Sequence, residues 1–449
     1  MKKVLKTNTS SIWRTRLASC RSEPRILQFL QGKHTRPGRG PSLWTLGSSI
    51  PTPYYTLYML ALGATPSEVG LINSLSIIGG TILEPLGGYL ADKRGRVRLV
   101  GLATFGYALC YILFAVAPDW RLLGAGQILQ QMLFFYAPGL NAIMADSLPP
   151  GTRGRGYALE RAFPLALGFI APYLGGLLIA YYGDGDAGLV VALRQCYWIA
   201  LAFGLFVAYL RLRYLKETIE NEQPTPGFNK LGDLLRESYG GIIETIRWLP
   251  SGFRPVVYVQ IIQASFIGMV APFWILYATQ SLGLSAVDWG TVLLISGFVG
   301  LLSIIPVGYL VDRFGSRKMI FLSIGMAIIS VAAFIYSAGF WATTLVLATL
   351  SISNSIVTPS WASLIADITP RERRGRVNAL LGENGILVST SRVAGGGVLL
   401  FIPSSLGAFI GGYLIEWNMT APFYILLAAL ILCLVISLRY LVEPKKAEI

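Results

Sequence analysis

The chain has 449 residues, of which 54% are hydrophobic and only 13% are charged. A soluble globular protein carries about 25% charged residues, so this composition excludes an ordinary soluble domain. The single histidine and the four widely separated cysteines exclude a zinc site and a disulfide framework. The net charge of +14 would suggest nucleic-acid binding in a soluble protein, but the distribution of the charge gives it another meaning.

The N-terminal segment, residues 1–41, is rich in Lys and Arg and has neither the apolar core nor the cleavage site of a signal peptide. We expect it to be a solvated cytoplasmic tail that is attracted to anionic lipid headgroups. The alternative is a nucleic-acid-binding arm.

From residue 42 onward, apolar stretches of about 20 residues follow one another, which is the length a helix needs to cross a bilayer. Helices are expected because backbone groups that face lipid must be hydrogen-bonded within their own segment. We predict an all-α polytopic membrane protein with 12 transmembrane helices in two pseudo-symmetric six-helix halves. The predicted spans are 42–62, 68–90, 99–117, 122–145, 157–182, 194–213, 255–279, 287–311, 319–338, 341–366, 377–415 and 420–441.

Lys and Arg lie in the tail, in alternate loops and at the C-terminal end. All but four of the 37 follow this pattern, and the exceptions are Arg121, Arg161, Arg194 and Arg392. The positive-inside rule places such loops in the cytoplasm. We therefore predict a multi-pass protein of the cytoplasmic (plasma) membrane with both termini in the cytoplasm.

The longest loop, 214–253, separates an N-terminal half, 42–213, from a C-terminal half, 254–442, which a short cytoplasmic end, 443–449, follows. Apolar residues between positions 231 and 246 of this linker fall on one helical face, which predicts an amphipathic helix in the membrane interface. The alternative is a tether with fluctuating helicity.

Two stretches of the first half recur in the second. Residues 88–95 read G-Y-L-A-D-K-R-G, and residues 308–315, which lie 220 positions later, read G-Y-L-V-D-R-F-G. Asp146 and Arg153 recur 221 positions later as Asp367 and Arg374. This repetition predicts two homologous halves in parallel orientation, related by an axis along the membrane normal, with a cavity between them.

The second half also contains an insertion. Arg376 and Gly411 are 35 positions apart, whereas their counterparts Arg155 and Gly175 are 20 apart. We expect roughly 15 additional residues in or beside the eleventh span, for which composition offers no physical reason.

The doubled loop motif resembles the G-x-x-x-D-(R/K)-x-G-(R/K) hallmark of the major facilitator superfamily, and the chain resembles the 12-span drug and metabolite efflux branch of that family. The resemblance implies the superfamily fold and transport by alternating access. It also implies that Asp92, with Arg153 and the start of span 11, latches the halves on the cytoplasmic side when the cavity opens outward. The alternative is topogenic charge that only anchors short loops. The residues assigned to the latch are Gly88, Asp92, Lys93, Gly95, Arg96, Asp146, Arg153, Gly308, Asp312, Arg313, Gly315, Asp367 and Arg374.

Residues 171–176, A-P-Y-L-G-G, are similar to the G-P-x-x-G-G core of efflux antiporters, with Ala171 in place of the first glycine. This similarity favours export. A kinked helix that packs closely on a neighbour would show the same residues without antiport.

Cavities in the superfamily are lined by spans 1, 4, 7 and 10. In this chain these spans carry amides, hydroxyls and aromatic rings at the spacing of one helical face, less regularly in span 7. They hold no charged residue, which favours a neutral or weakly charged organic solute. The alternative for each residue is hydrogen bonding between packed helices. The candidate solute-binding residues are Thr52, Tyr55, Gln127, Gln130, Gln131, Phe134, Gln260, Gln263, Asn354, Thr358 and Trp361.

Glu84 in the second span and Glu383 in the eleventh are the candidates for proton coupling, because a carboxylate within the membrane is costly and can carry a proton. The alternative is a structural role near the interface. Many proton-coupled relatives have an arginine in span 4 where this chain has Gln127, so coupling through that arginine is not expected.

We expect a secondary active transporter that exports a small organic solute and is coupled to protons, and we expect neither an enzyme nor a cofactor nor a metal site. The alternatives are a passive facilitator or uniporter, and a membrane sensor of the same fold that does not transport. The expected partners are the solute, the lipid bilayer and protons, without nucleic acid, and the expected state is a monomer.

Overall fold

The computed structural model describes residues 39–147, 153–183, 185–215, 217, 231–370, 373–382, 386, 388 and 397–441, without the side chains of 39–41, 92–94, 145, 153–162, 231–238 and 251. Within these ranges the chain is almost entirely helical. Ten helical segments are long and apolar enough to cross a membrane. They are Pro66–Ala91, Arg96–Val116, Phe163–Tyr182, Asp186–Tyr214, Arg254–Gln280, Ala286–Phe314, Ser316–Ile335, Gly339–Ile368, Val398–Trp417 and Ala421–Tyr440.

The helices fall into two groups of six passes, as predicted, if each interrupted pair is counted as one pass. The N-terminal half consists of α3 (Arg39–Ser49), η1 (Thr52–Tyr54), α4 (Tyr55–Ala61), α5 (Pro66–Arg94), α6 (Arg96–Val116), α7 (Trp120–Leu133), η2 (Phe134–Tyr136), α8 (Ala137–Ser147), α9 (Arg153–Tyr182) and α10 (Asp186–Tyr214). The linker contains α11 (Leu231–Trp248) and η4 (Ser251–Phe253). The C-terminal half consists of α12 (Arg254–Val270), η5 (Ala271–Phe273), α13 (Trp274–Gln280), α14 (Ala286–Phe314), α15 (Ser316–Ile335), α16 (Gly339–Ile368), α17 (Arg374–Leu381), α18 (Val398–Trp417) and α19 (Ala421–Tyr440).

The internal repeat extends to the way corresponding helices begin and end. Helix α5 starts with a capping box at 65–68, and α14 starts with one at 285–288. In each box a hydroxyl oxygen accepts from a free N–H of the first turn and a carboxylate accepts from the N-cap N–H. Both helices end at a glycine, Gly95 and Gly315, with a φ of +87° in each. Glycine adopts this left-handed conformation without strain, so both loops turn at once into the next helix.

Three passes are broken by a 3₁₀ turn with a proline in it or beside it. Pass one breaks at η1, which contains Pro53, pass seven at η5, which contains Pro272, and pass four at η2, just before Pro138. Proline has no N–H and its ring clashes with the carbonyl four residues earlier, which disfavours a continuous helix. The predicted spans 42–62, 122–145 and 255–279 are therefore each divided into two helices, whereas α16 remains helical through Pro359.

The predicted eleventh span, 377–415, is two helices rather than one, and the expected insertion lies between them. Helix α17 ends before Gly382, whose φ is +62°, and α18 begins after Gly397. The N–H of Gly397 donates to the carbonyl oxygen of Leu381 over 3.1 Å, and a Cβ on Gly397 would lie 2.2 Å from the last turn of α17. The ends of the two helices therefore meet at Leu381 and Gly397, and we call the additional residues between them, 382–396, the span-11 insertion, of which the structure describes 382, 386 and 388.

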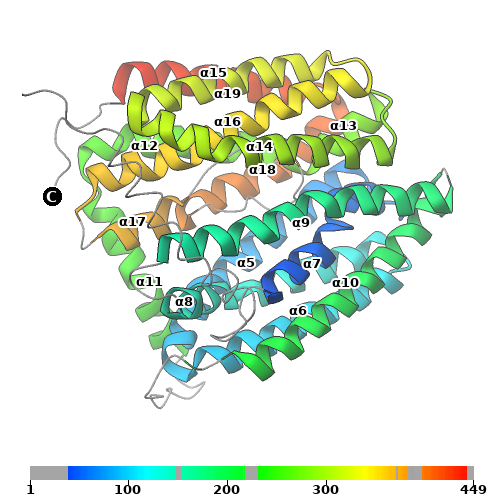
Figure 1. The fold of residues 1–449 in the computed structure, drawn as a ribbon, viewed down its shortest axis with the longest axis horizontal. Helices are drawn as coiled ribbons and strands as arrows, with labels where there is room; N and C mark the ends of the chain where they lie inside the picture. Colours follow the sequence, from blue (N-terminus) through cyan, green and yellow to red (C-terminus); the bar gives the residue numbers. More distant parts are fainter. Residues whose placement is uncertain are drawn as a thin grey trace, which may run out of the picture.

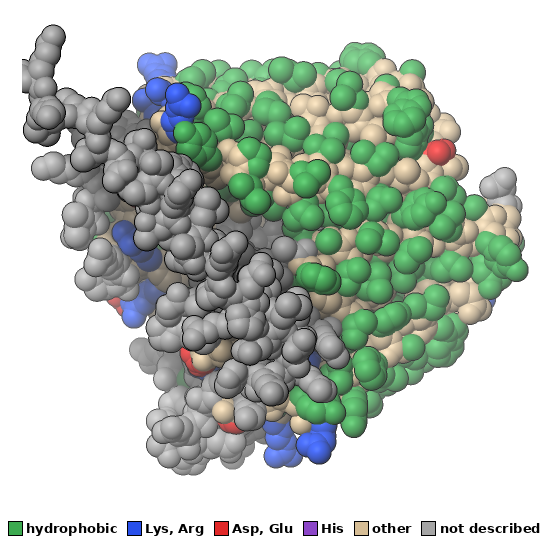
Figure 2. All heavy atoms as spheres, viewed as in Figure 1, with side chains coloured by type: hydrophobic (Ala, Val, Ile, Leu, Met, Phe, Trp, Pro, Cys, Tyr) green, Lys and Arg blue, Asp and Glu red, His purple; other side chains and the backbone are tan. Residues whose placement is uncertain are grey.

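The two halves lie one above the other in Figure 1, with α14, α15, α16 and α19 at the top and α6, α7, α8 and α10 at the bottom. Across the junction α5 packs on α18 and α9 packs on α14. Helices α11 and α17 lie at the left, which we call the linker end, and the opposite end is the far end. Figure 2 shows hydrophobic side chains over most of the described face and Lys and Arg mostly toward the linker end. This surface fits a multi-pass membrane protein.

Candidate functional site

A buried tyrosine joins the two halves at the far end. Tyr54, at the break in pass one, is fully buried. Its hydroxyl donates to the carbonyl oxygen of Pro172 in α9 over 2.7 Å and lies 3.0 Å from the carbonyl oxygen of Ala286 in α14. A helical carbonyl has a second lone pair, so both helices can keep their own hydrogen bonds. One hydroxyl therefore connects two passes of the first half with one of the second.

Four glycines allow the helix backbones of the two halves to touch at this end. A Cβ on Gly176 in α9 would lie 2.6 Å from a carbonyl oxygen of α14, and one on Gly290 in α14 would lie 2.7 Å from a carbonyl oxygen of α9. In the α5–α18 pair, a Cβ on Gly70 would lie 2.6 Å from a carbonyl oxygen, and one on Gly412 would lie 2.5 Å from another. Only glycine fits at such distances, which gives two equivalent close contacts related by the internal repeat.

Two polar contacts complete the junction. The hydroxyl of Thr56 in α4 donates to the carbonyl oxygen of Pro272, at the break in pass seven, over 2.6 Å. The hydroxyl of Ser67 donates to a carboxylate oxygen of Glu416 over 3.0 Å, which brings this negative charge to the N-terminus of α5. A helix N-terminus stabilises such a charge. We call Tyr54, Thr56, Ser67, Glu416 and the four glycines the far-end seal.

The candidate amides of pass four bond mainly within their own half. The side-chain N–H of Gln127 donates to Oδ1 of Asn73 in α5 over 3.2 Å, and that of Gln130 donates to the carbonyl oxygen of Tyr107 in α6 over 3.5 Å. The Oε1 atoms of Gln127 and Gln131 are buried and have no hydrogen-bond donor among the described residues. The bonded groups join packed helices, and the two amide oxygens are left as acceptors.

The other candidates of the first half lie in similar surroundings. Tyr55 is buried, with its hydroxyl 3.5 Å from the carbonyl oxygen of Leu123. The hydroxyl of Thr52 donates to the carbonyl oxygen of Ser48 over 2.6 Å. Phe134 packs in an aromatic cluster with rings of passes three and four. These three side chains therefore shape the interior of the N-terminal half.

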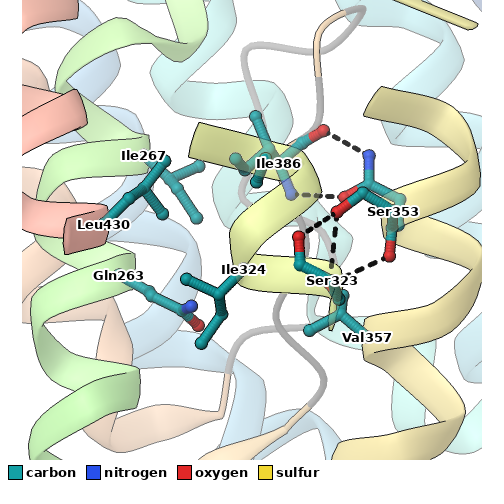
Figure 3. A pocket seen from close by; sticks show the side chains of 10 residues that line it. Gln263, Ile267, Ser323, Ile324, Ser353, Val357, Ile386 and Leu430 are labelled. Carbon is teal, nitrogen blue, oxygen red and sulfur yellow. Dashed lines mark hydrogen bonds between the residues drawn. The ribbon is translucent and has the colours of Figure 1, made fainter. Parts of the chain in front are cut away.

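In the C-terminal half the structure brings Gln263 and Asn354 to one small pocket, shown in Figure 3. The Nδ2 of Asn354 donates to the carbonyl oxygen of Ile386 over 2.7 Å, and its Oδ1 accepts from the N–H of Ile386 over 2.9 Å. The hydroxyls of Ser323 and Ser353 lie 3.1 Å apart in the same pocket. The pocket measures about 20 Å³, which is room for one water molecule and far below the volume of an organic solute.

The remaining candidates of the second half do not line this pocket. Gln260 in α12 is fully buried, and Thr358 in α16 is half-buried. Trp361 is fully buried, and its indole N–H has no acceptor among the described residues. The candidates that line the pocket of Figure 3 are therefore all from the C-terminal half.

The first copy of the latch motif contains a close ion pair. Nη1 of Arg96, at the start of α6, lies 2.6 Å from Oδ2 of Asp146, near the end of α8. The arginine side chain is 15% exposed and the aspartate side chain is 49% exposed, so the pair lies partly out of solvent. The side chains of Asp92, Lys93 and Arg153 lie outside the described residues.

The second copy of the motif differs from the first. The counterpart of the paired arginine is Ser316, so Asp367 has no equivalent arginine to bind there. Asp312 and Arg313 are exposed, while Nε of Arg374 donates to a backbone carbonyl in the preceding turn over 3.1 Å. The ion pair of the first half is therefore not repeated.

Of the two candidate carboxylates, Glu84 is half-buried in α5, directly before Pro85, and Glu383 lies outside the described residues. Helix α11 docks beside Glu84, where the hydroxyl of Tyr239 donates to the carbonyl oxygen of Ile82. Burial raises the pKa of Tyr239, and the negative charge of Glu84 raises it further. A linker residue thus contacts pass two next to this carboxylate.

Helix α11 contacts the C-terminal half as well. A carboxylate oxygen of Glu244 lies 3.3 Å from Nη1 of Arg376, and the other lies 3.7 Å from Nη1 of Arg373. The guanidinium group of Arg373 lies 4.7 Å from the ring centroid of Trp248. The linker helix therefore bridges α5 of one half and α17 of the other at the linker end.

The sequence analysis did not identify most of the far-end seal, although a repeated sequence pattern marks two of its glycines, Gly176 and Gly412. Residues 407–412, G-A-F-I-G-G, repeat the pattern of 171–176, A-P-Y-L-G-G. The 236 positions that separate them equal the 221 of the neighbouring repeat plus the 15 of the span-11 insertion. Tyr54 and Glu416 belong to no repeated motif, and only their contacts identify them.

Comparisons with known proteins agree with this architecture. Residues 43–395 and 256–449 match the family model described as Major Facilitator Superfamily. The chain is similar to the multidrug resistance protein MdtG of Serratia proteamaculans (strain 568), with 28% identity over 295 residues that cover 63% of the chain and 66% of MdtG. It is similar to the quinolone resistance protein NorA of Staphylococcus aureus (strain Mu50), with 22% identity over 385 residues that cover 84% of the chain and 89% of NorA.

Solved structures share the fold. The crystal structure of the peptide transporter POT in complex with alafosfalin aligns with a TM-score of 0.64 and 14% identity, over 92% of this chain and 97% of that chain. The proteins named here are transporters and resistance proteins rather than enzymes, which confirms the expectation that this chain is not an enzyme.

Proposed function

Because the chain belongs to the Major Facilitator Superfamily, we propose that it exports a small, neutral or weakly charged organic solute by alternating access, in exchange for protons. The observation that carries the proposal is the far-end seal. Tyr54, Thr56 and Ser67 of the first half bond directly to the second half at the far end, whereas α11 bridges the halves at the linker end. Alternating access needs such a contact, which forms in one state and breaks in the other.

We place the linker end in the cytoplasm, because the basic loops lie there, and both termini with it. In this orientation the described state is closed toward the outside. The candidate residues of passes 1, 4, 7 and 10 face the solute at some stage of the cycle, with the amide oxygens of Gln127 and Gln131 as acceptors. The Arg96–Asp146 pair holds the 2/3 loop in place, and Asp92 latches the halves when the cytoplasmic side closes. The protein acts as a monomer.

Glu84 carries the proton in this proposal. It is the carboxylate in the described part of a membrane pass that lies next to a docking point of the linker, so its access to the cytoplasm can change when α11 moves. Export, rather than uptake, is supported by the names of MdtG and NorA, which describe resistance to drugs.

Proteoliposomes with an imposed pH step test the proposal. A thermal-shift screen with drug-like compounds, starting with quinolones, first identifies a solute. The wild-type protein is then expected to accumulate the solute against its gradient when the pH step is imposed, and Glu84→Gln is expected to lose this accumulation while keeping downhill exchange. Glu68→Gln is the matched control, because Glu68 lies on the same helix but only caps its first turn, a role that glutamine can fill.

The alternatives give different results in the same assay. A facilitator would move the solute only down its gradient and would ignore the pH step. A sensor would bind the solute without flux. If Glu84→Gln still accumulates the solute when the pH step is imposed, Glu84 does not carry the coupled proton.

A further inference from the structure

We propose that Asn354 recognises solutes that carry an N–H and a C=O on one carbon atom, the pattern of a single peptide residue, and that Ile386 of the span-11 insertion occupies this site as a built-in competitor. The inference rests on the proposed transport function and names its solute class. Two observations carry it: the hydrogen-bond pattern of Asn354, and the position of the insertion relative to the internal repeat.

The amide of Asn354 makes a matched pair of hydrogen bonds with one backbone residue. It donates to the carbonyl oxygen of Ile386 over 2.7 Å and accepts from the N–H of the same residue over 2.9 Å. In an antiparallel sheet, a residue of a hydrogen-bonded pair presents its N–H and C=O to its partner in this way. The side chain thus reads the polar groups on both sides of one α-carbon, and any solute with that arrangement can satisfy it.

The surroundings of Ile386 resemble a binding site with an occupant. Ile386 is 5% exposed and lines the pocket together with Ile267, Ile324 and Leu430 of three different passes, as Figure 3 shows. Polar groups of Gln263 and of the Ser323–Ser353 pair line the same pocket. Apolar walls with a few convergent polar groups are typical of small-molecule sites. With the occupant present, only about 20 Å³ is empty.

The insertion is not needed to build the pass that contains it. Its counterpart in the first half, α9, is one helix of 30 residues, whereas α17 and α18 together have 28. The N–H of Gly397 donates to the carbonyl oxygen of Leu381 over 3.1 Å, so the two ends of the pass meet without the residues between them. The insertion brings Ile386 to a polar residue that faces the interior of the C-terminal half. This placement fits a tethered ligand better than a structural element of pass 11.

The test measures binding of N-acetyl-isoleucinamide, which presents the groups of Ile386, to the purified full-length protein by isothermal titration calorimetry. A variant that lacks 382–396 joins Leu381 to Gly397 and restores the register of the first half. We expect it to bind the probe at least about tenfold more tightly, because a site that is vacant for about a tenth of the time loses that factor in apparent affinity. Asn354→Ala in the deletion background is expected to cancel the gain.

Ser355→Ala is the matched control, because the Ser355 hydroxyl donates to the carbonyl oxygen of Gly300 in α14 rather than toward the pocket. It should leave the gain unchanged. If the deletion variant does not fold, Ile386→Pro in the full-length protein removes the N–H that Asn354 binds and is expected to raise probe affinity several-fold. Unchanged affinity in the folded release variant, or a gain that survives Asn354→Ala, would overturn the inference. Because the readout is binding, absent transport would count only against the proposed function.

Discussion

The hydroxyl of Tyr54 should set the balance between the state closed at the far end and the state open there. Tyr54→Phe removes the bonds to Pro172 and Ala286 and keeps the ring that fills the junction. A buried hydrogen bond contributes about 1 kcal/mol net, and side-chain bonds between membrane helices average about 0.6 kcal/mol. The single hydroxyl hydrogen is shared between the two carbonyl oxygens, and the part that bonds to Ala286 exists only when the halves touch, so losing it should raise the ratio of open to closed molecules by at most about threefold to fivefold.

Double electron–electron resonance can measure this ratio. Spin labels at Ala187 and Trp341, both exposed near the far ends of the two halves, report the distance between them in a background without native cysteines. Tyr58→Phe is the matched control, because the Tyr58 hydroxyl is equally buried but donates to the carbonyl oxygen of Phe114 within the first half, over 2.8 Å. It should leave the ratio unchanged. Equal populations in both variants would refute the idea that this hydroxyl acts between the halves.

Three further predictions concern the charged contacts. Glu416→Gln removes a charge from the N-terminus of α5 that is worth up to about 1 kcal/mol, so it should raise the open fraction at the far end up to about fivefold at low salt and less at high salt. The same distance measurements at two ionic strengths check this, and an equal effect at both would contradict it. In a double-mutant cycle of Arg96→Gln and Asp146→Asn, thermal unfolding should give a coupling of up to about 1 kcal/mol, and strict additivity would show that the pair does not stabilise the 2/3 loop. Glu244→Gln weakens the ion pairs to α17, so it should speed the hydrogen exchange of backbone amides in α11 but not in α10, as measured by mass spectrometry. Unchanged protection of α11 would mean that these ion pairs do not hold the helix.

Much of the fold follows from local sequence because helix ends and spans depend on nearby residues. Helix ends and spans are set within one or two turns by the capping boxes at 65–68 and 285–288, by the glycines at 95 and 315, and by runs of apolar residues. Proline alone does not decide which passes break, since it is tolerated within some membrane helices, as in α16, and neighbouring helices decide which ones bend.

The candidate site was harder to predict for a physical reason. The spacing of Gln127 and Asn354 along their helices is the same whether the side chain faces a cavity, a neighbouring helix or an insertion. Here Gln127 bonds to Asn73, and Asn354 bonds to Ile386. Sequence spacing sets the face of the helix but not the partner, and the partner depends on tertiary contacts between residues far apart in the chain.

The glycine contacts of the far-end seal have a geometric consequence. Gly176 and Gly290 mark one point where backbone meets backbone, and Gly70 and Gly412 mark a second. Two rigid bodies that touch at two points have a fixed line of contact, so the closed state sets the angle at which the halves meet, and this end opens only when both points separate. An alanine at a single point would hold the backbones apart there and tilt the closed halves, which is a different defect from losing one hydrogen bond of the seal.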